Sequence, residues 1–417
     1  MGLGDWVRGW LAWWRGERTR SITRIAGEGA ALDKVSEVVR LHEPPKPGHL
    51  RAFDRDPRLL PKPKLAFNRK PPKVMDANEA NRLFAGTLRT KNRGIRDLLP
   101  NEEQLKRYGL PLWRTELDVA NALGVTIGVL RWLSIHRPRE TQPHYVTFAI
   151  PKRSGGQRLI TAPKKRLKAA QRALVTALID KLPVAEPVHG FRAGRSVKTN
   201  AEPHVGRAIV LHMDLEDFFH TVSYARVRGY LIALGYGFPV AAVLSALVTE
   251  AERQPVEVGE QVFHVPVGPR RCVQGAPTSP GLCNAITRKL DRRLAGLAKK
   301  LGWTYTRYAD DLTFSSDDPT TVTAMHEGAK RIVEAEGFRV NAKKTRVMRK
   351  GGAQRVTGVT VNRVLGLSRL ERRKLRAAIH QHGADPEWQA RLDGHVAYVH
   401  MLNPGQAELL RKRMPKP

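Results

Sequence analysis

The chain has 417 residues, enough for two or three domains, and its 41% hydrophobic content is enough to build a large core. A formal net charge of +33 implies a polyanionic partner, with nucleic acid favoured over an anionic membrane surface. No apolar run could span a bilayer, no secretory signal is recognisable, and two cysteines are too few for a disulfide framework, so we expect a cytoplasmic protein without membrane contact.

Residues 1–110 are expected to form a largely helical N-terminal extension. Four tryptophans fall at helical spacing and share one face of a predicted helix over 1–40: Trp6, Trp10, Trp13 and Trp14. That face could dock on the chain's own core, or bind another protein, RNA bases or a membrane interface. Residues 43–73 mix prolines with Lys and Arg, which indicates a linker that is either solvated or laid along an RNA backbone. Short helices are expected within 76–108.

Beyond residue 110, β-type alternation and helical periodicity follow one another. Amphipathic helices are expected around 117–130 and a hairpin over 145–163, then a helix over 164–182, a strand within 208–219, helices over 224–250 and a polar hairpin ending at 267. A loop and helix over 274–301, a hairpin over 303–316, a helix over 321–338, a short strand over 356–362 and helices from 368 complete the order. This alternation predicts an α+β centre with a helical end.

Adjacent carboxylates interrupt the hairpin "WTYTRYADDLTFSS". Asp310 and Asp311 lie at its bend, where two solvated turn aspartates would be the simplest interpretation. Asp214 ends the apolar strand "IVLHMD" and offers a third carboxylate. If the two strands are neighbours, these side chains can bridge two Mg²⁺ ions roughly 3.5 to 4 Å apart, an arrangement used for in-line phosphoryl transfer.

Four motifs in this order resemble those of reverse transcriptases: "IPKRSGGQRLITAP" (150–163), "MDLEDFF" (213–219), "QGAPTSP" (274–280) and "YADD" (308–311). The resemblance covers about residues 115–417 and implies a right-hand polymerase. Its fingers, with the start of the palm, would occupy 111–212, its palm 213–350 and its thumb 351–417. The extension over 1–110 exceeds the usual lead-in of the family.

The resemblance implies roles for individual residues. Asp214, Asp310 and Asp311 would be the metal ligands, with the Leu215 carbonyl as a further contact. The nucleotide site would comprise Lys152 and Arg158 on the triphosphate, Phe219 beneath the sugar, Gln274 and Gly275 against the nucleotide, and Lys343 or Lys344 near the pyrophosphate as a general acid. Alternatively, the cations are solvated and Phe219 is a core aromatic.

Two short signatures resemble those of retron reverse transcriptases: Asn200-Ala201-x-x-His204 and Val356-Thr357-Gly358. The resemblance implies RNA recognition by Asn200, His204, Val356, Thr357 and Gly358. It also implies phosphate contacts by a basic helix face with Arg369, Arg372, Arg373 and Arg376. Taken alone, His204 could be a surface or core histidine and Asn200 could brace a loop. Residues 356–358 could form a strand with a turn, and the arginines could be a solvated face.

The implied activity is that of an RNA-directed DNA polymerase. It would bind a structured noncoding RNA, prime from a guanosine 2′-OH and use deoxynucleotides to make branched RNA-linked single-stranded DNA, known as msDNA. It would act in antiphage defence, with an effector protein as a possible partner. Two alternatives remain open: another bacterial reverse transcriptase, of the group II intron or abortive-infection type, or a non-catalytic RNA-binding scaffold.

Overall fold

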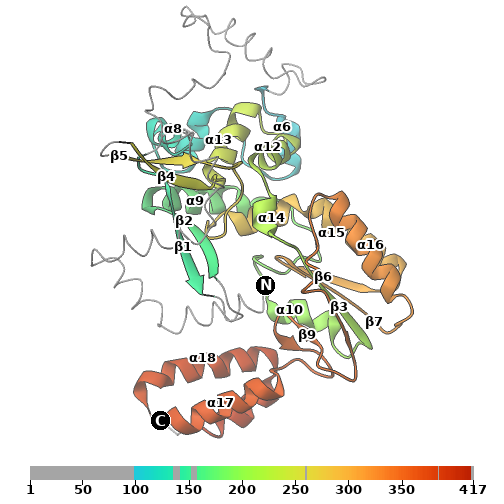
Figure 1. Ribbon diagram of the computed structural model, residues 1–417. Coiled ribbons are helices and arrows are strands. Elements are labelled where there is room, and N and C mark those ends of the chain that lie inside the picture. The colour runs from blue at the N-terminus through green and yellow to red at the C-terminus, as the bar shows by residue number, and fades with distance from the viewer. Residues whose placement is uncertain (1–97, 135–140, 152–156, 259–260, 384, 415–417) are drawn as a thin grey trace, which may run out of the picture. The chain divides into compact units, whose positions relative to one another are not determined.

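The computed structural model describes residues 98–134, 141–151, 157–258, 261–383 and 385–414 (Figure 1). The predicted tryptophan helix, the proline-rich linker and Lys152 lie outside the described residues. The described chain forms two compact units. The hairpin unit contains Val222–Ser279 and the described residues up to Leu182, and the sheet unit contains Pro183–Thr221 and the residues from Pro280 onward. Each unit is therefore assembled from separate parts of the chain.

The first two helices of the hairpin unit begin at side-chain caps. The Asn101 side chain accepts a hydrogen bond from the Gln104 amide, and Thr115 and Asp118 form a capping box at the next helix. The helices are α6 (Glu102–Arg107), α7 (Glu116–Ala122), α8 (Ile127–Ser134), α9 (Lys165–Ala177), α12 (Tyr224–Ala233) and α13 (Phe238–Val248), with a 3₁₀ turn at Ile179–Lys181. The helices predicted around 117–130, 164–182 and 224–250 are confirmed, two of these regions each containing two helices.

Two antiparallel hairpins complete this unit. β1 (Tyr145–Pro151) pairs with β2 (Gln157–Pro163), and β4 (Arg253–Val258) pairs with β5 (Gln261–Pro266), as predicted. The base of the first hairpin is fixed because the buried Tyr145 hydroxyl accepts a 2.7 Å hydrogen bond from Gln171 on α9. At the same hairpin, the Thr161 amide donates to the Gln274 carbonyl at 2.9 Å. The "QGAPTSP" loop is thereby attached to β2.

The sheet unit is built on a four-stranded antiparallel sheet in the order β6-β7-β3-β8. Its strands are β6 (Thr304–Tyr308), β7 (Asp311–Ser316), β3 (Ile209–Asp214) and β8 (Arg346–Arg349). The two central strands, β3 and β7, are almost entirely buried, as their apolar and hydroxyl-rich sequences require. α15 packs on β6 and α16 packs on α15.

The sheet unit also contains short helices and two longer amphipathic helices, α15 and α16. They are α10 (Val197–Ala201), the 3₁₀ turn Glu202–His204, α11 (Phe218–Thr221), α14 (Ser279–Ile286), α15 (Arg288–Lys300) and α16 (Val322–Ala335). α10 also contacts β6. The helix predicted over 321–338 and the hairpin predicted over 303–316 are confirmed, and the single helix predicted within 274–301 is divided into α14 and α15. No helix among the described residues has the length and apolar character needed to cross a membrane.

The region 356–362 differs from the prediction. Residues 356–362 were expected to form a single short strand, but β9 (Arg355–Val356) and β10 (Val359–Thr360) form a tight hairpin. The chain reverses at Thr357 and Gly358, which both have positive φ, +48° and +85°, as a two-residue hairpin turn requires. The helices α17 (Arg369–His382) and α18 (Pro386–Leu402) then follow, as predicted, and α19 (Pro404–Arg411) extends the helical tail beyond Pro404, where it was expected to end.

Candidate active site

Strand pairing brings the distant carboxylates together in the sheet unit. β3 lies beside β7 in a register that places Asp214 opposite Asp311. Immediately beyond this pair, the Leu215 amide donates a 2.9 Å hydrogen bond to the Asp310 carbonyl. The neighbouring positions predicted for Asp214 and the 310–311 bend are therefore confirmed, which leaves their roles in chemistry as a proposal.

The two cross-strand carboxylates are enclosed. Asp214 is 1% exposed and Asp311 is 2% exposed. Burial, followed by the repulsion of Asp311, raises the pKa of Asp214 to about 7. The folded protein therefore resists having both carboxylates ionised, and a cation at this position would relieve the repulsion.

A cationic side chain already lies on Asp214. The Lys344 ammonium donates to both carboxylate oxygens of Asp214, at 2.8 and 2.9 Å. Burial lowers the pKa of Lys344 to about 8. The ion pair with Asp214 stabilises both charged forms, so it opposes the lowering of the Lys344 pKa and the raising of the Asp214 pKa. The Asn341 amide, donating to the Asp214 carbonyl at 2.8 Å, holds this segment beside β3. Lys343, the alternative for the predicted basic position, is exposed.

His212 is a further residue of the site that sequence reasoning missed. It lies two positions before Asp214 on β3, so both side chains share one face of the strand. Its Nε2 is 3.1 Å from the Asp311 carboxylate. Burial alone would lower the pKa of His212, but the hydrogen bond and charge of Asp311 outweigh burial and raise it. The period-two alternation of the strand was the signal that could have identified this histidine.

The donor set suits a hard divalent cation. Asp214 and Asp310 offer carboxylate oxygens, the ligands that Mg²⁺ prefers, and the Lys344 ammonium marks Asp214 as a position that accepts positive charge. Among the described residues, no three His, Cys, Asp or Glu side chains are arranged as a metal site, and the Asp311 carboxylate is engaged by His212. The residues fit a cation centred on Asp214.

The predicted nucleotide-binding residues are distributed over both units. Arg158 lies on β2 and Gln274 and Gly275 on the adjoining loop, all in the hairpin unit, whereas Phe219 lies on α11 of the sheet unit. The Phe219 ring is partly buried and packs against Phe218 with ring centroids 5.4 Å apart. The contacts of these residues with a nucleotide remain a prediction.

The retron-type signatures occupy the interior of the sheet unit. Asn200, His204 and Val356 are fully buried and Thr357 is 4% exposed. The His204 ring nitrogens are hydrogen-bonded to the hydroxyls of Ser315 at 2.7 Å and Thr306 at 2.8 Å. These side chains therefore lie inside the fold, and the RNA recognition predicted for them stays a proposal.

Both signatures instead contribute to one core. Val197 and Ala201, which flank Asn200 on α10, pack in the same cluster as Val356 and Val359. Gly358 is only half buried and brings the turn of the β9–β10 hairpin to the surface. The signatures thus shape the fold around this turn, and Gly358 is their part that an RNA backbone could approach.

Acidification is expected to destabilise the protein through two buried histidines. Burial is the main cause that lowers the pKa of His204 to about 3 and that of His189 to about 4. Below pH 6.5 the unfolded chain binds more protons at these positions than the folded chain, so each histidine lowers the stability by about 1 kcal/mol per pH unit as the pH drops from about 6.5 toward 4. Protonation of Asp214, whose pKa is raised to about 7, offsets part of this decline.

Urea unfolding midpoints between pH 7.5 and 5 measure this dependence. His204→Gln should flatten the decline, whereas His380→Gln, at an exposed position on α17, should leave it unchanged. Equal slopes for the His204→Gln protein and the unaltered chain would contradict the assignment.

The basic face predicted in the C-terminal region lies on α17. Arg369, Arg373 and Arg376 are exposed and Arg372 is partly buried. α17 begins at a capping box between Ser368 and Glu371, and its buried residues Leu375 and Ile379 pack on α18 and α19. The helix therefore holds its arginines on a stable support, and their contact with phosphates remains a proposal.

Comparison with known proteins identifies the class. Residues 150–376 match the family described as "Reverse transcriptase (RNA-dependent DNA polymerase)". The chain is thus an RNA-directed DNA polymerase with a mixed α and β right-hand polymerase fold, a class that works on RNA templates with divalent metal ions. Solved structures with weaker similarity include a telomerase from Candida albicans (TM-score 0.41, 12% identity, 66% of this chain and 57% of that chain).

The particular family follows from curated relatives. The chain is 59% identical to the Retron Mx65 reverse transcriptase of Myxococcus xanthus over 99% of each chain. It is 45% identical to the Retron Mx162 reverse transcriptase of the same organism (74% of this chain, 68% of that one). It is 31% identical to the Retron Ec86 reverse transcriptase of Escherichia coli (67% and 82%). The chain belongs to the retron reverse transcriptases.

Proposed function

We propose that this chain makes msDNA: it binds a structured noncoding RNA, primes from the 2′-OH of one guanosine, and extends that primer into branched RNA-linked single-stranded DNA. A role in antiphage defence with an effector protein completes the proposal. The observation that carries the catalytic part is the cross-strand pairing of Asp214 with Asp311, next to the Asp310 bend. The full-length likeness to a retron enzyme supports the choice of product.

Each residue has a defined task in this proposal. Asp214, Asp310 and Asp311, with the Leu215 carbonyl, would hold two Mg²⁺ ions, and these ions would supply Lewis-acid chemistry for the attacking hydroxyl and the leaving pyrophosphate. Lys344 can release a proton near neutral pH because burial lowers its pKa to about 8, which suits a general acid for the pyrophosphate. Arg158 and Lys152 bind the triphosphate as a forked guanidinium and a point charge.

The nucleic acid that accompanies the protein tests the proposal directly. The full chain is expressed with its flanking genomic DNA, purified, and its bound nucleic acid is treated with RNase, DNase or both and then sequenced. The expected result is a species that contains both RNA and DNA, with the DNA attached at the 2′ position of a guanosine of the RNA. Bound RNA without attached DNA, in a preparation that extends a DNA primer on an RNA template, would contradict the retron product while retaining the polymerase.

Phe219 provides a test of sugar selection. An aromatic ring beneath the sugar would collide with a ribose 2′-OH, so Phe219→Val is expected to raise ribonucleotide incorporation relative to deoxynucleotides by about tenfold or more. Single-nucleotide extension with matched dNTP and rNTP measures the ratio. Phe263→Val, on β5 of the other unit, is the matched control and should leave the ratio unchanged. Unaltered selectivity in Phe219→Val would indicate that Phe219 is a packing residue.

A further inference from the structure

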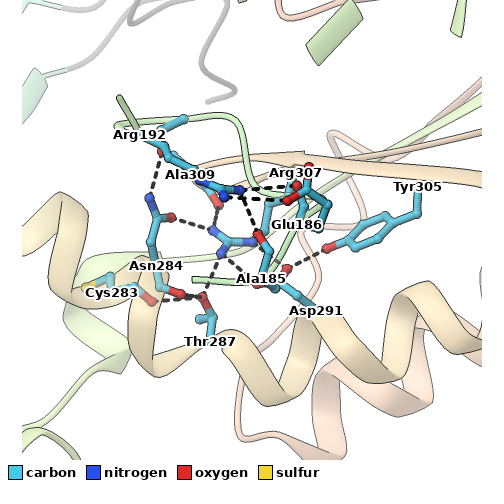
Figure 2. Close-up of polar contacts among 11 residues, drawn as sticks. Ala185, Glu186, Arg192, Cys283, Asn284, Thr287, Asp291, Tyr305, Arg307 and Ala309 are labelled. Atoms are coloured by element: carbon cyan, nitrogen blue, oxygen red, sulfur yellow. Dashed lines mark hydrogen bonds and ion pairs between the residues drawn. The ribbon is translucent and has the colours of Figure 1, made fainter. Parts of the chain in front are cut away.

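A buried arginine lies immediately before the "YADD" bend. Arg307, on β6, is fully buried, and its guanidinium lies against α14 and α15 (Figure 2). Burial of a charge on this scale is tolerated only when the charge is paired and its donors are hydrogen-bonded. The polar surroundings of Arg307 meet both conditions.

The guanidinium uses all five of its N–H donors. Nε and Nη2 donate to the two carboxylate oxygens of Asp291, at 2.7 and 2.8 Å, in a bidentate pair. Nη2 also donates to the Thr287 hydroxyl at 2.8 Å, and Nη1 donates to Asn284 Oδ1 at 3.0 Å. The remaining bond runs from Nη1 to the Ala309 carbonyl at 2.8 Å.

The bond to Ala309 connects this network to the carboxylates. Ala309 has φ +57°, a left-handed conformation that residues with a side chain rarely adopt, and it directly precedes Asp310. The Arg307 guanidinium is also 5.6 Å from the centre of the Phe218 ring, four residues after Asp214. One side chain therefore contacts the segments that carry Asp214 and Asp310.

A second contact closes the bend from the other side. Asn284 Nδ2 donates to the Gly190 carbonyl at 2.7 Å while Asn284 Oδ1 accepts from Arg307. A Cβ added at Gly190 would lie 2.8 Å from both the Ala309 nitrogen and the Tyr308 ring, so the Gly190 backbone lies directly against the bend. The left-handed residue is thus enclosed between Gly190 and the guanidinium.

We propose that Arg307 is a positioning residue for DNA synthesis: by holding the Ala309 carbonyl in a charge-neutral network with Asp291, it fixes the bend that presents Asp310. This inference rests on the proposed role of Asp214 and Asp310. Replacing Arg307 by lysine would retain the positive charge but not this role. A lysine has three donors on one nitrogen and cannot reach Asp291, Asn284, Thr287 and Ala309 together.

The test is primer extension on an RNA template by the full chain. Three quantities are measured: kcat, the KM for dNTP, and the Mg²⁺ concentration that gives the half-maximal rate. Arg307→Lys is expected to lower kcat by about 10- to 100-fold, since small misplacements of reacting groups have effects of that size. It should raise the Mg²⁺ requirement and change KM less than about threefold. Arg293→Lys is the matched control and should behave as the unaltered chain, because Arg293 lies on α15, the helix that carries Asp291, but is 42% exposed and pairs with Glu336 instead.

A second variant separates positioning from stability. Arg307→Met combined with Asp291→Asn removes both buried charges, so it should melt higher than Arg307→Met alone. The positioning role requires kcat to stay low in this double variant although the protein is folded. Recovery of kcat to within about twofold of the unaltered chain, or Arg307→Lys kinetics equal to those of Arg293→Lys, would overturn the inference.

The proposed site and the positioning role fail in different ways. If Asp214→Asn retains polymerisation, the carboxylate site itself is misassigned. If Asp214→Asn is inactive while Arg307→Lys matches its control, only the positioning role is lost.

Discussion

Asp214→Asn is expected to lower metal-dependent nucleotide addition by about a thousandfold or more while leaving RNA binding unchanged. The substitution preserves the shape of the side chain but removes the charge that would hold a metal ion, and an amide oxygen is a much weaker ligand for Mg²⁺. RNA binding depends on positive charge spread over the protein, which carries 72 Lys and Arg. Primer extension and filter binding on the same preparation measure the two properties.

The same variant should not lose stability. The pKa of Asp214 is raised to about 7 in the folded protein, above its ordinary value of 3.8, so its ionisation works against folding as the pH rises from about 4 through 7. At pH 8 without divalent metal, Asp214→Asn is therefore expected to melt no lower than the unaltered chain. Lys344 is 23% exposed and can reach water once its partner is neutral.

Asp393→Asn is the control for this prediction. Asp393 is an exposed carboxylate on α18, so the variant has the same change in net charge without touching the site. Full activity is expected for Asp393→Asn. Polymerisation by Asp214→Asn at the control rate would show that the sheet does not hold the catalytic metal ions.

Gly275→Ala is expected to produce the second large effect, in the hairpin unit. Gly275 has φ +127°, which residues with a side chain rarely adopt, and an added Cβ would lie 2.7 Å from the Thr161 carbonyl and 2.9 Å from the Ile160 side chain. Both neighbours belong to β2, so the loop must move away from the strand. We expect a loss of about 1 to 3 kcal/mol in stability and, because the loop is proposed to pack against the nucleotide, a KM for dNTP raised by about tenfold.

Gly268→Ala is the matched control in the same unit. A Cβ at Gly268 would meet no atom within 4 Å, and its backbone has no positive φ. Thermal melting and dNTP titration of the two variants give the comparison. A normal KM for Gly275→Ala, together with reduced stability, would limit the loop to a structural role.

Sequence alone was sufficient where local pattern decides the structure. The alternation of "YVTFAIP" and "QRLITAP" predicted β1 and β2, and the adjacent aspartates at 310 and 311 marked the bend that follows β6. Burial of Asp214 beside Asp311 follows from the apolar run of β3, because a buried strand needs neighbours on both edges. The site could be anticipated because its carboxylates lie at the ends of such strands.

Tertiary contacts decided what the sequence could not. Lys343 and Lys344 are adjacent and identical, so only the path of the chain beside β3 selects Lys344 as the partner of Asp214. The sequence left open whether 356–358 form a continuous strand or a strand with a turn, because a β-branched residue such as Thr357 rarely has positive φ. From the sequence His204 could be a surface or a core histidine, and the hydroxyls of Thr306 and Ser315, which hydrogen-bond its ring, place it in the interior. A polar residue type alone does not reveal whether the side chain is buried or exposed.

The order of strands in the sheet has a consequence for synthesis on the ribosome. β3 is the first strand of its sheet to be made, yet both of its neighbours, β7 and β8, come much later in the chain. Until Asp311–Ser316 emerges, the apolar strand Ile209–Asp214 has two unpaired edges, the kind of segment on which nascent chains aggregate. We therefore expect this topology to slow folding and to raise the risk of aggregation during expression, whatever the stability of the finished protein.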